Sequence, residues 1–302
     1  MRIAVAGASG LIGEALLEAL RADGHDVLTL VRRTPRTVDE HRWDPQHRRI
    51  DPAVLADVDA AVNLGGTPIR PRPFTAGYKE RLLRSRLDAT TTISTALAAA
   101  AVADPGRPRV LLSASATGYY GDTGSRTVTE QDPAGSDFLA QLCAQWEAAT
   151  APAQAAGVRV VHLRTGLVLD RRAMLIRILR TVFTLGVGGR MGSGRQYWPW
   201  ISLIDQIGAM RHLLTADVSG PVNLTGPAPV TNAEFTRELA RQVHRPAVLP
   251  IPAFAIHLAL GEFGRSTVTG GQRAMPLRLE ESGYTFTHTD LSSALRAATA
   301  AR

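Results

Sequence analysis

The start of the chain places a short apolar stretch directly before three regularly spaced glycines. Residues 2–6 have the composition of a buried strand, and apolar residues recur at helical spacing over residues 11–20. Gly7, Gly10 and Gly13 therefore fall at a strand-to-helix junction, where they allow a tight turn, close approach of a phosphate and close packing of the helix on the strand. Because a helix N-terminus favours an anionic pyrophosphate, the sequence predicts a dinucleotide site at this turn. The residues expected to contact the cofactor here are Gly7, Ser9, Gly10, Leu11, Ile12 and Gly13.

The second apolar stretch, residues 25–31, ends in two arginines. Proteins that select NAD commonly place an acidic residue at this point to hold the ribose hydroxyls. Arg32 or Arg33 would instead pair with a 2′-phosphate in a bidentate geometry. We therefore expect NADP(H) as the cofactor, the alternative being that both arginines are solvated residues at the end of a strand.

Strand-like and helical stretches alternate over the first half of the chain. Strands are expected at residues 59–63, 109–115 and 159–164, and helices at about 76–101 and 136–156. This alternation predicts an α/β fold with a doubly wound parallel sheet of the Rossmann type. Ligands bind at the carboxyl ends of such strands, so residues there are further candidates for cofactor binding. They are Leu64, Gly65, Gly66, Ser113 and Arg164.

The second half of the chain is less regular. Helices are expected at residues 174–185, 205–214, 231–243 and 254–260 and from residue 290, with a strand at 221–225. A segment rich in glycine and aromatic residues, 186–200, is typical of a loop that covers a substrate. Within it, Arg195, Gln196 and Trp200 are expected to contact the substrate, Arg195 by holding a carboxylate or phosphate.

Two regions follow from this pattern. A cofactor-binding domain is expected at residues 1–170, with a later contribution from about 200–245. A substrate-side region is expected at residues 171–302, and it includes a small C-terminal domain from about residue 250.

Composition narrows the partners that we expect. The chain carries a net charge of +7, but Lys79 is its only lysine, and the arginines are scattered without a basic run, which argues against nucleic acid. No secretory signal precedes the first strand, apolar runs are too short to span a bilayer, and the single cysteine, Cys143, cannot form an intramolecular disulfide. We expect a cytoplasmic protein without a membrane partner that acts on a small molecule, and leave open a homodimer. No spacing of histidine, cysteine and carboxylates suggests a metal site.

These stretches together resemble a known family. The G-x-x-G-x-x-G turn is similar to that of the extended short-chain dehydrogenase/reductases, and the whole chain resembles an atypical branch described as epimerase family proteins, of the NAD-dependent epimerase/dehydratase family, with a family-specific C-terminal domain. The resemblance implies a Rossmann domain and chemistry of the oxidoreductase or epimerase type on a carbonyl or sugar-like substrate. It rests on residues 7–13, 62–66, 85–86, 113–121, 146–147, 164–169, 192–196, 200–201, 223–227, 272–276 and 283–286.

The chain departs from that superfamily at its proton relay. The superfamily uses Tyr-x-x-x-Lys, in which the lysine lowers the pKa of the tyrosine, and here no tyrosine is followed four residues later by a lysine. The resemblance places Leu139 and Cys143 in these two positions and Ser115 in the catalytic serine position. We interpret Ser115, Tyr119 and Tyr120 as the catalytic set, in which Ser115 hydrogen-bonds the developing alkoxide and a neutral tyrosine donates the proton. The alternative is that the tyrosines only pack and position the cofactor.

Four further residues are interpreted with their alternatives. Glu130 is a candidate general acid or base, although a solvated loop carboxylate is favoured. Arg86, with the preceding Ser85, either contacts a ligand or faces solvent, and the sequence favours solvent. Cys143 is interpreted as helix packing. Ser202 stands where the family more often has a histidine, which argues against a histidine-dependent proton transfer.

Two classes of function follow. The first is an NADP(H)-dependent oxidoreductase or epimerase, which the cover loop at residues 186–200 favours. The second is an NADP(H)-binding redox sensor with little or no catalysis, which the missing tyrosine–lysine pair favours.

Overall fold

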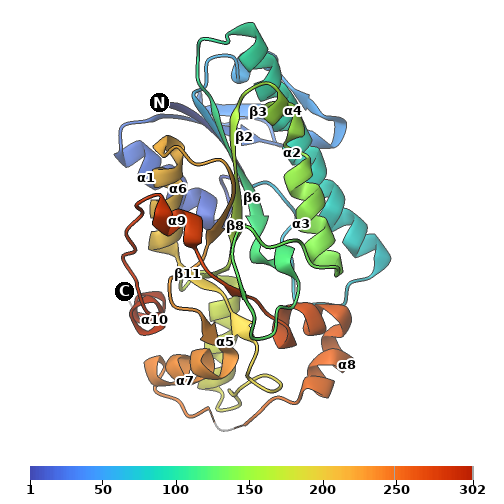
Figure 1. Ribbon diagram of the computed structural model, residues 1–302, viewed down its shortest axis with the longest axis vertical. Helices are drawn as coiled ribbons and strands as arrows, with labels where there is room; N and C mark the ends of the chain where they lie inside the picture. The colour runs from blue at the N-terminus through green and yellow to red at the C-terminus, as the bar shows by residue number, and fades with distance from the viewer. Residues whose placement is uncertain (248, 301–302) are drawn as a thin grey trace.

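The computed structural model describes residues 1–247 and 249–300, and its upper half is built on one eight-stranded sheet (Figure 1). The strand order is β12-β8-β6-β5-β1-β2-β3-β4, and all neighbouring strands are parallel except β3 and β4. The strands are β1 (Arg2–Ala6), β2 (Asp26–Val31), β3 (Glu40–Asp44), β4 (Arg49–Ile50), β5 (Ala60–Asn63), β6 (Val110–Ala116), β8 (Arg159–Thr165) and β12 (Gly220–Leu224).

Helices cover both faces of this sheet, as Figure 1 shows. On one face α1 (Leu11–Ala22) and α6 (Leu203–Thr215) pack against the strands through a cluster that includes Leu16 and Met210. On the other face α2 (Ala76–Ala103), α3 (Phe138–Ala148) and α4 (Ala151–Ala155) lie over the sheet, with Ile93 and Ala153 in the second cluster. The predicted α/β doubly wound fold is confirmed.

The strand order reverses between β1 and β5. From β1 the chain passes through α1 to β2 on one side, and it later returns to β5 on the other side of β1. In open α/β sheets this reversal leaves a crevice at the carboxyl ends of the two strands, where ligands bind. The glycine turn after β1 and the segment after β5 therefore lie at the expected cofactor position.

Two local features differ from the predictions. The polar segment that forms β3 and β4 was not expected to be a strand, because only Trp43 is buried within β3. The helix expected at 136–156 is divided into α3 and α4, and Pro152 lies at the start of α4. A proline lacks the N–H of a helix interior, so it is accommodated in a new first turn.

The lower half of the molecule contains the remaining helices. They are α5 (Met174–Thr184), α7 (Asn232–Gln242), α8 (Ala253–Phe263) and α10 (Leu291–Thr299), with α9 (Leu277–Glu281) beside β12 (Figure 1). Phe183, Trp200, Phe235 and Leu295 join α5, α7 and α10 in a separate core. Thr231 and Glu234 form a capping box at the start of α7.

Short strand pairs and helical turns complete the described chain. β9 (Leu167–Leu169) pairs with β11 (Trp200–Ser202), β10 (Tyr197–Trp198) with β13 (Val230–Thr231), and β7 (Thr127–Val128) with β14 (Arg273–Ala274). Helical turns cover Pro45–His47 (η1), Pro52–Val54 (η2), Thr117–Tyr120 (η3) and Gly264–Thr269 (η4). α6 and β12 return to the large sheet after the chain has entered the lower half. The division into two regions stays a prediction.

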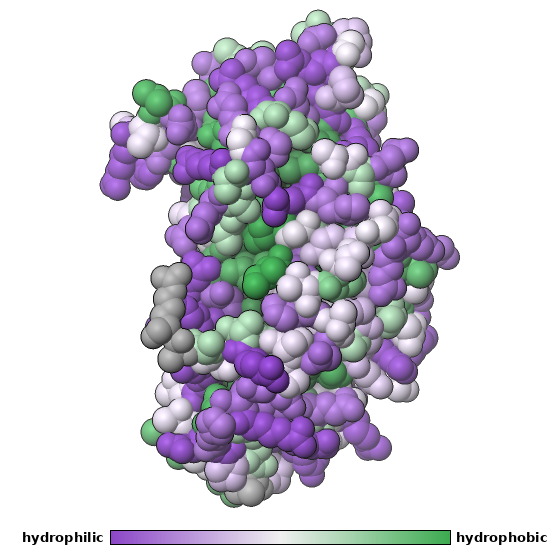
Figure 2. All heavy atoms as spheres, turned by 90° about the vertical axis from the view of Figure 1, so that its left-hand side faces the viewer, coloured by the Kyte–Doolittle hydropathy of each residue, from purple (hydrophilic) through white to green (hydrophobic). Residues whose placement is uncertain are grey.

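Figure 2 shows one side of the molecule, the left-hand side of Figure 1. Hydrophilic side chains cover most of its upper and lower ends, and hydrophobic side chains gather near mid-height. No helix in the described part of the chain combines the length and apolar character needed to cross a bilayer. Within residues 1–247 and 249–300 no cluster of histidine, cysteine and carboxylate side chains has the arrangement of a metal site.

Candidate functional site

The three glycines of the first turn have different structural roles. Gly7 has a positive φ of 82°, and a Cβ there would lie 2.8 Å from the carbonyl of Leu64. A Cβ on Gly13 would collide with the carbonyl oxygen of Gly7. Gly10 is exposed, and a Cβ there would meet only the Gly7 oxygen, at 3.4 Å. Gly7 and Gly13 are therefore required by the fold itself, whereas Gly10 leaves the turn open to a ligand.

The N-terminus of α1 has the features of an anion site. Gly10 is its N-cap, and no side chain caps the helix there. The first N–H groups of a helix lack intrahelical acceptors and carry the positive end of the helix dipole. Ser9 is exposed beside them, and Leu11 and Ile12 are half-buried. The residues present fit a pyrophosphate.

Asn63 orders the neighbouring segment after β5. Its Nδ2 donates to Thr90 Oγ1 at 2.8 Å, and its Oδ1 accepts the N–H of Gly65 at 3.1 Å. Leu64 and Gly65 are half-buried and Gly66 is exposed. Thr90 Oγ1 also accepts the indole N–H of Trp146 at 2.8 Å, so the same network reaches α3.

The two arginines after β2 are not equivalent. Arg33 donates to both carboxylate oxygens of Glu40, at 2.7 and 2.5 Å. This contact holds the pKa of Glu40 at about 2 and raises the pKa of Arg33. Arg32 is exposed and forms no ion pair with another described residue. Arg32 is therefore the arginine available for a 2′-phosphate.

The hydroxyl expected to face the substrate lies in a buried polar cluster instead. Ser115 donates to Glu147 Oε1 at 2.7 Å, and Arg164 forms a bidentate pair with the same carboxylate, with both contacts at 2.9 Å. Arg164 Nη1 also donates to Tyr120 Oη at 3.0 Å, and its guanidinium lies 3.4 Å from the centroid of the Tyr119 ring. We define these five residues as the Glu147 cluster.

This placement corrects four expectations at once. Ser115 and Arg164 are only 4% and 3% exposed, and their polar groups are occupied by Glu147. Tyr120 is buried and donates to Asn223 Oδ1 at 2.7 Å, and burial raises its pKa to about 12. Ser115, Tyr119 and Tyr120 are not among the residues that line the cavity described below. Arg164 is likewise committed to the Glu147 cluster rather than open to a cofactor.

Two further polar residues are more buried than expected. Glu130 is 5% exposed, its Oε1 accepts the N–H groups of Asn223 at 2.9 Å and Arg278 at 3.4 Å, and burial raises its pKa. The interpretation of Glu130 as a solvated loop carboxylate is therefore wrong. Ser113 is 1% exposed, lies opposite Asn63 in the sheet, and its hydroxyl has no described partner.

A large apolar cavity of about 760 Å³ opens where the carboxyl ends of β6 and β8 meet the lower half. Ala116, Thr117 and Gly118 line it from the end of β6, and Thr165 to Leu167 from the end of β8. Helices from both halves complete the wall, with apolar side chains that include Leu142, Trp146, Leu175, Ile178, Ile256 and Phe263. This cavity lies at the edge of the sheet where a substrate is expected.

The two residues that the resemblance assigns to the positions of the tyrosine and lysine line this cavity. Leu139 and Cys143 both line it, one turn apart on α3. Cys143 is buried, and burial raises its pKa to about 12, so that it is a neutral thiol. Among the described residues, Thr117 and Thr267 line the cavity with hydroxyls that form no side-chain hydrogen bond, and Thr117 is the one that directly follows β6. The resemblance to the superfamily instead places Ser115, two residues earlier in the chain, in the catalytic serine position.

Arg86 is buried, contrary to the expectation that it faces solvent. It is 7% exposed, it lines the cavity, and its guanidinium lies 4.9 Å from the centroid of the Trp146 ring. Its Nη1 donates to the carbonyls of Thr67 at 3.1 Å and Leu82 at 3.0 Å, while Ser85 Oγ accepts the N–H of Thr67 at 3.0 Å. Ser85 and Arg86 thus fix the segment after Gly66 and do not face solvent.

The predicted cover loop contributes to the cavity through other residues than expected. Met191, Tyr197, Trp198 and Pro199 line the cavity, whereas Arg195 is exposed and does not. Gln196 is buried and donates to the carbonyls of Met191 and Val268, which joins the loop to η4. These contacts make Gln196 a structural residue in this conformation.

Burial also bears on two expectations near β11. Trp200 is 1% exposed within the lower core, and its indole N–H donates to the carbonyl of Ala228 at 2.9 Å. Ser202 caps α6, donates to Asp205 at 2.7 Å and lies 2.9 Å from His288 Nδ1. Ser202 does not line the cavity. Its contacts with Asp205 and His288 hold the C-terminal segment in place and do not reach a ligand in the cavity.

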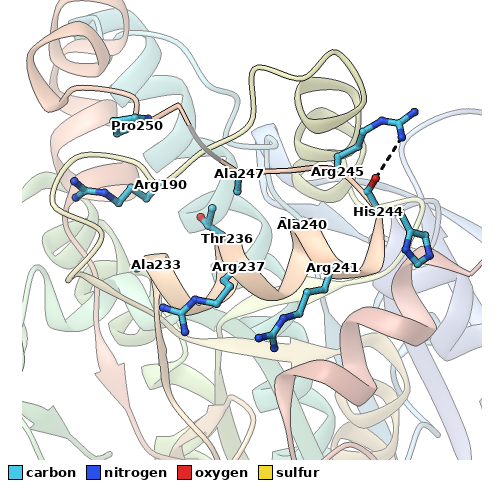
Figure 3. Close-up of a pocket in the computed structure, with 10 residues that line it drawn as sticks. All are labelled: Arg190, Ala233, Thr236, Arg237, Ala240, Arg241, His244, Arg245, Ala247 and Pro250. Carbon is cyan, nitrogen blue, oxygen red and sulfur yellow. Dashed lines mark hydrogen bonds between the residues drawn. The ribbon is translucent and has the colours of Figure 1, made fainter.

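A second hollow lies on the surface beside α7 (Figure 3). Alanines and Thr236 form the part of α7 that faces Ala247 and Pro250, whereas Arg237 and Arg241 point away from it. Arg190 donates to the carbonyls of Gly192 and Ser193, and Arg245 to the carbonyl of His244. The cationic groups do not converge on a common centre, so this hollow does not form an anion site.

Known proteins share both the sequence pattern and the architecture. The model of the NAD dependent epimerase/dehydratase family matches residues 3–225, and that of a domain of unknown function (DUF1731) matches residues 251–298. The epimerase family protein Mb2239 of Mycobacterium bovis is 49% identical over 298 residues, which cover 98% of this chain and 97% of the relative.

Two solved structures are similar over nearly the full chain. The human epimerase family protein SDR39U1 (isoform 2), solved with NADPH, is 30% identical with a TM-score of 0.86, covering 99% of each chain. A nucleoside-diphosphate sugar epimerase from Corynebacterium glutamicum is 32% identical with a TM-score of 0.81, covering 99% of this chain and 58% of that one.

Proposed function

Since the chain belongs to the NAD-dependent epimerase/dehydratase family, we propose that it binds NADP(H) and supports hydride transfer, of the oxidoreductase or epimerase type, to a carbonyl compound held in the apolar cavity. The observation that carries this proposal is the position of the cavity. Its wall includes the strand ends Ala116–Thr117 and Thr165–Gly166, on the same edge of the sheet as the glycine turn after β1. A ligand extending from that turn along the strand ends would reach the cavity.

The residues of this chain suit the phosphates of NADP(H). The open turn at Gly10 and the uncapped N-terminus of α1 would hold the pyrophosphate, and Arg32 the 2′-phosphate. The segment at Leu64 and Gly65, ordered by Asn63, would lie across the cofactor from that turn. The human relative, solved with NADPH, supports this choice of cofactor. When bound, NADPH supplies a hydride.

The cavity itself would orient the substrate. Thr117 is placed to donate a hydrogen bond to a substrate oxygen, because it lines the cavity directly after β6 and its hydroxyl forms no hydrogen bond with another described residue. The apolar wall would exclude water from the reacting carbonyl, which strengthens each polar contact made there. Thr117 thus takes the role that the sequence assigned to Ser115.

A second candidate function is favoured by one specific observation. Leu139 and Cys143 occupy the positions of the superfamily's tyrosine and lysine, and both face the cavity as groups that do not transfer protons at neutral pH. A protein that binds NADP(H) and changes its interactions with redox state, without turnover, would need no relay there. This candidate is an NADP(H)-binding redox sensor.

Two measurements test the proposal and separate the candidates. Fluorescence titration with NADPH and NADH should show saturable binding that favours NADPH, and failure of both nucleotides to bind would refute both candidates. Single-turnover incubation with 4-deuterated NADPH and a panel of aldehydes and ketones should then place deuterium in one product. Binding without deuterium transfer to any member of a panel spanning aliphatic, aromatic and acidic carbonyls would favour the sensor.

A further inference from the structure

Arg86 and the apolar wall around it define the chemistry of the ligand more narrowly than the family does. We propose that the cavity takes an apolar acid, a molecule with a hydrocarbon body and one carboxylate or phosphate, and that Arg86 binds the anionic group. The proposal rests on the proposed function in one respect, namely that this cavity is the substrate site.

The cavity is poorly suited to a nucleotide sugar. Its walls are formed mainly by aliphatic and aromatic side chains from α3, α5, α8 and the loop before β10. Among residues 1–247 and 249–300, the charged side chains that line it are those of Arg86 and Asp137. Asp137 is the N-cap of α3, where its carboxylate accepts the N–H of Ala140 at 2.8 Å. A sugar and a diphosphate would leave many polar groups without partners against such walls, whereas a hydrocarbon body would be stabilised by burial.

Arg86 is a buried cation without a counter-ion among the described residues. Its side chain is buried, with an exposed fraction of 7%. No described carboxylate lies within ion-pair distance of its guanidinium. Only Nη1 donates, to two backbone carbonyls, and Nε is buried without a partner. A buried charge is costly unless it is paired, so an anionic ligand would satisfy a charge that the protein leaves unpaired.

The groups next to Arg86 hold it in place without neutralising it. The Trp146 ring lies under the guanidinium, and the Trp146 indole N–H is anchored on Thr90. Gly66 packs against the Arg86 side chain, where a Cβ would lie 3.3 Å from Cγ. Burial lowers the pKa of Arg86 from its usual value, but a guanidinium keeps its proton at neutral pH. The side chain is therefore a cationic group held in place in the wall of an apolar cavity.

Isothermal titration of the wild-type protein with matched probes tests the proposal directly. Decanoate and 1-decanol share a hydrocarbon chain and differ in charge, and each is titrated with and without saturating NADPH. A charge-assisted hydrogen bond is worth enough to favour decanoate by about tenfold or more in Kd. Equal affinity of the two probes, or tighter binding of UDP-glucose than of decanoate, would overturn the proposal.

Substitutions on α2 test whether Arg86 is the residue that binds the carboxylate of decanoate. Arg86→Met should bring the affinity for decanoate down to that for 1-decanol, and Arg86→Lys should retain part of the preference. Arg84→Met is the matched control, since Arg84 is exposed on the same helix and pairs with Glu80. Decanoate affinity that is unchanged in Arg86→Met would overturn the assignment to this residue. The comparison of decanoate with 1-decanol uses the wild-type protein. It therefore tests the proposal even if the Arg86→Met variant folds poorly.

The same titrations separate this inference from the proposed function. If NADPH fails to bind but decanoate is preferred, the assignment of the cofactor is wrong and the acid site stands. If Arg86→Met weakens NADPH and leaves the preference for decanoate intact, Arg86 serves the cofactor and the inference is wrong.

Discussion

Ser115 Oγ donates a hydrogen bond of 2.7 Å to Oε1 of Glu147, a carboxylate that Arg164 also binds through two contacts. This hydrogen bond turns the serine of the superfamily's catalytic position toward α3 and away from the cavity. Glu147 is therefore the residue that decides how the end of β6 is used. It holds Ser115 and Arg164 in a buried cluster and leaves Thr117 as the hydroxyl residue beside the end of β6 that lines the cavity.

The two hydroxyls at the end of β6 should respond differently to removal. Thr117→Ala should lower the single-turnover rate of NADPH oxidation by about 10²-fold, the usual effect of losing one donor to a developing oxyanion. Ser115→Ala should leave that rate within about threefold and lower stability by about 1 kcal/mol, since one hydrogen bond is lost. Thr117→Ser keeps the hydroxyl and is the control. A slow Ser115→Ala with a fast Thr117→Ala would restore the original assignment.

The Glu147 cluster should be essential for stability. Glu147→Ala would leave the Arg164 guanidinium buried without its carboxylate, which costs about 3–5 kcal/mol in comparable buried pairs. Chemical denaturation measures the change in the free energy of unfolding. Glu80→Ala removes the partner of Arg84 from an exposed pair on α2 and should change that free energy by less than about 1 kcal/mol. Similar losses in the two variants would contradict the role given to the cluster.

Discrimination between NADPH and NADH should depend on Arg32 more than on Arg33. Arg32→Ala should raise the Kd for NADPH by about tenfold and leave NADH binding unchanged, because the proposed contact of this arginine is with the 2′-phosphate alone. Arg33→Ala should have a smaller effect, since Glu40 already occupies that guanidinium. Nucleotide titration of both variants is the measurement. Equal effects of the two substitutions, or an equal loss of NADH binding, would refute this assignment.

Glu130 should give a pH-dependent contribution to stability with a definite sign. Burial raises its pKa in the folded protein, so the folded state holds the proton more tightly than the unfolded state. The carboxyl group therefore favours folding most below its unfolded pKa, and this contribution is lost as the pH rises through the folded value. The free energy of unfolding of Glu130→Gln relative to wild type should increase from pH 4.5 to pH 7. A difference that is constant with pH would show that Glu130 does not titrate differently on folding.

The sequence was sufficient to predict the glycine turn at which the cofactor is expected to bind. Gly7 and Gly13 are required by contacts within their own turn, which a glycine pattern between a strand and a helix reveals directly. The end of β6 was harder, because the pattern shows that hydroxyls end the strand but not which of them points to the cavity. That choice depends on Glu147 and Arg164, which lie 32 and 49 residues away from Ser115.

The role of Arg86 depends on still longer contacts. An arginine in a polar stretch of a long helix is typical of a solvated position, and its burial arises from the segment after Gly66 and from Trp146 on α3. Neither Trp146 nor the neighbouring Ser85 has a sequence pattern that indicates contact with Arg86. Similarly, the sequence predicts α8 as a helix but does not predict that it lines the cavity. That position depends on how the C-terminal segment packs against the ends of the strands.

The pH dependence of any turnover should be flat through neutrality. Thr117 is a hydroxyl that does not titrate near pH 7, and burial raises the pKa of both Cys143 and Tyr120 to about 12. No group with the character of a lysine-assisted tyrosinate lines the cavity in the described chain, so the proton must come from a neutral donor or from water. The single-turnover rate of NADPH oxidation should therefore change by less than about twofold between pH 6 and pH 8.

Two groups outside the cavity would be implicated by a different result. His162 lies 3.7 Å from Glu147 and burial lowers its pKa, while burial raises the pKa of Glu130. A steep inflection near pH 7 that disappears in His162→Gln or in Glu130→Gln would show that the Glu147 cluster or its surroundings carries a proton to the reaction. Such a result would replace the neutral-donor mechanism with a relay through the interior. A flat profile in wild type, together with a uniformly slow Thr117→Ala at every pH, would support the donor at the cavity wall.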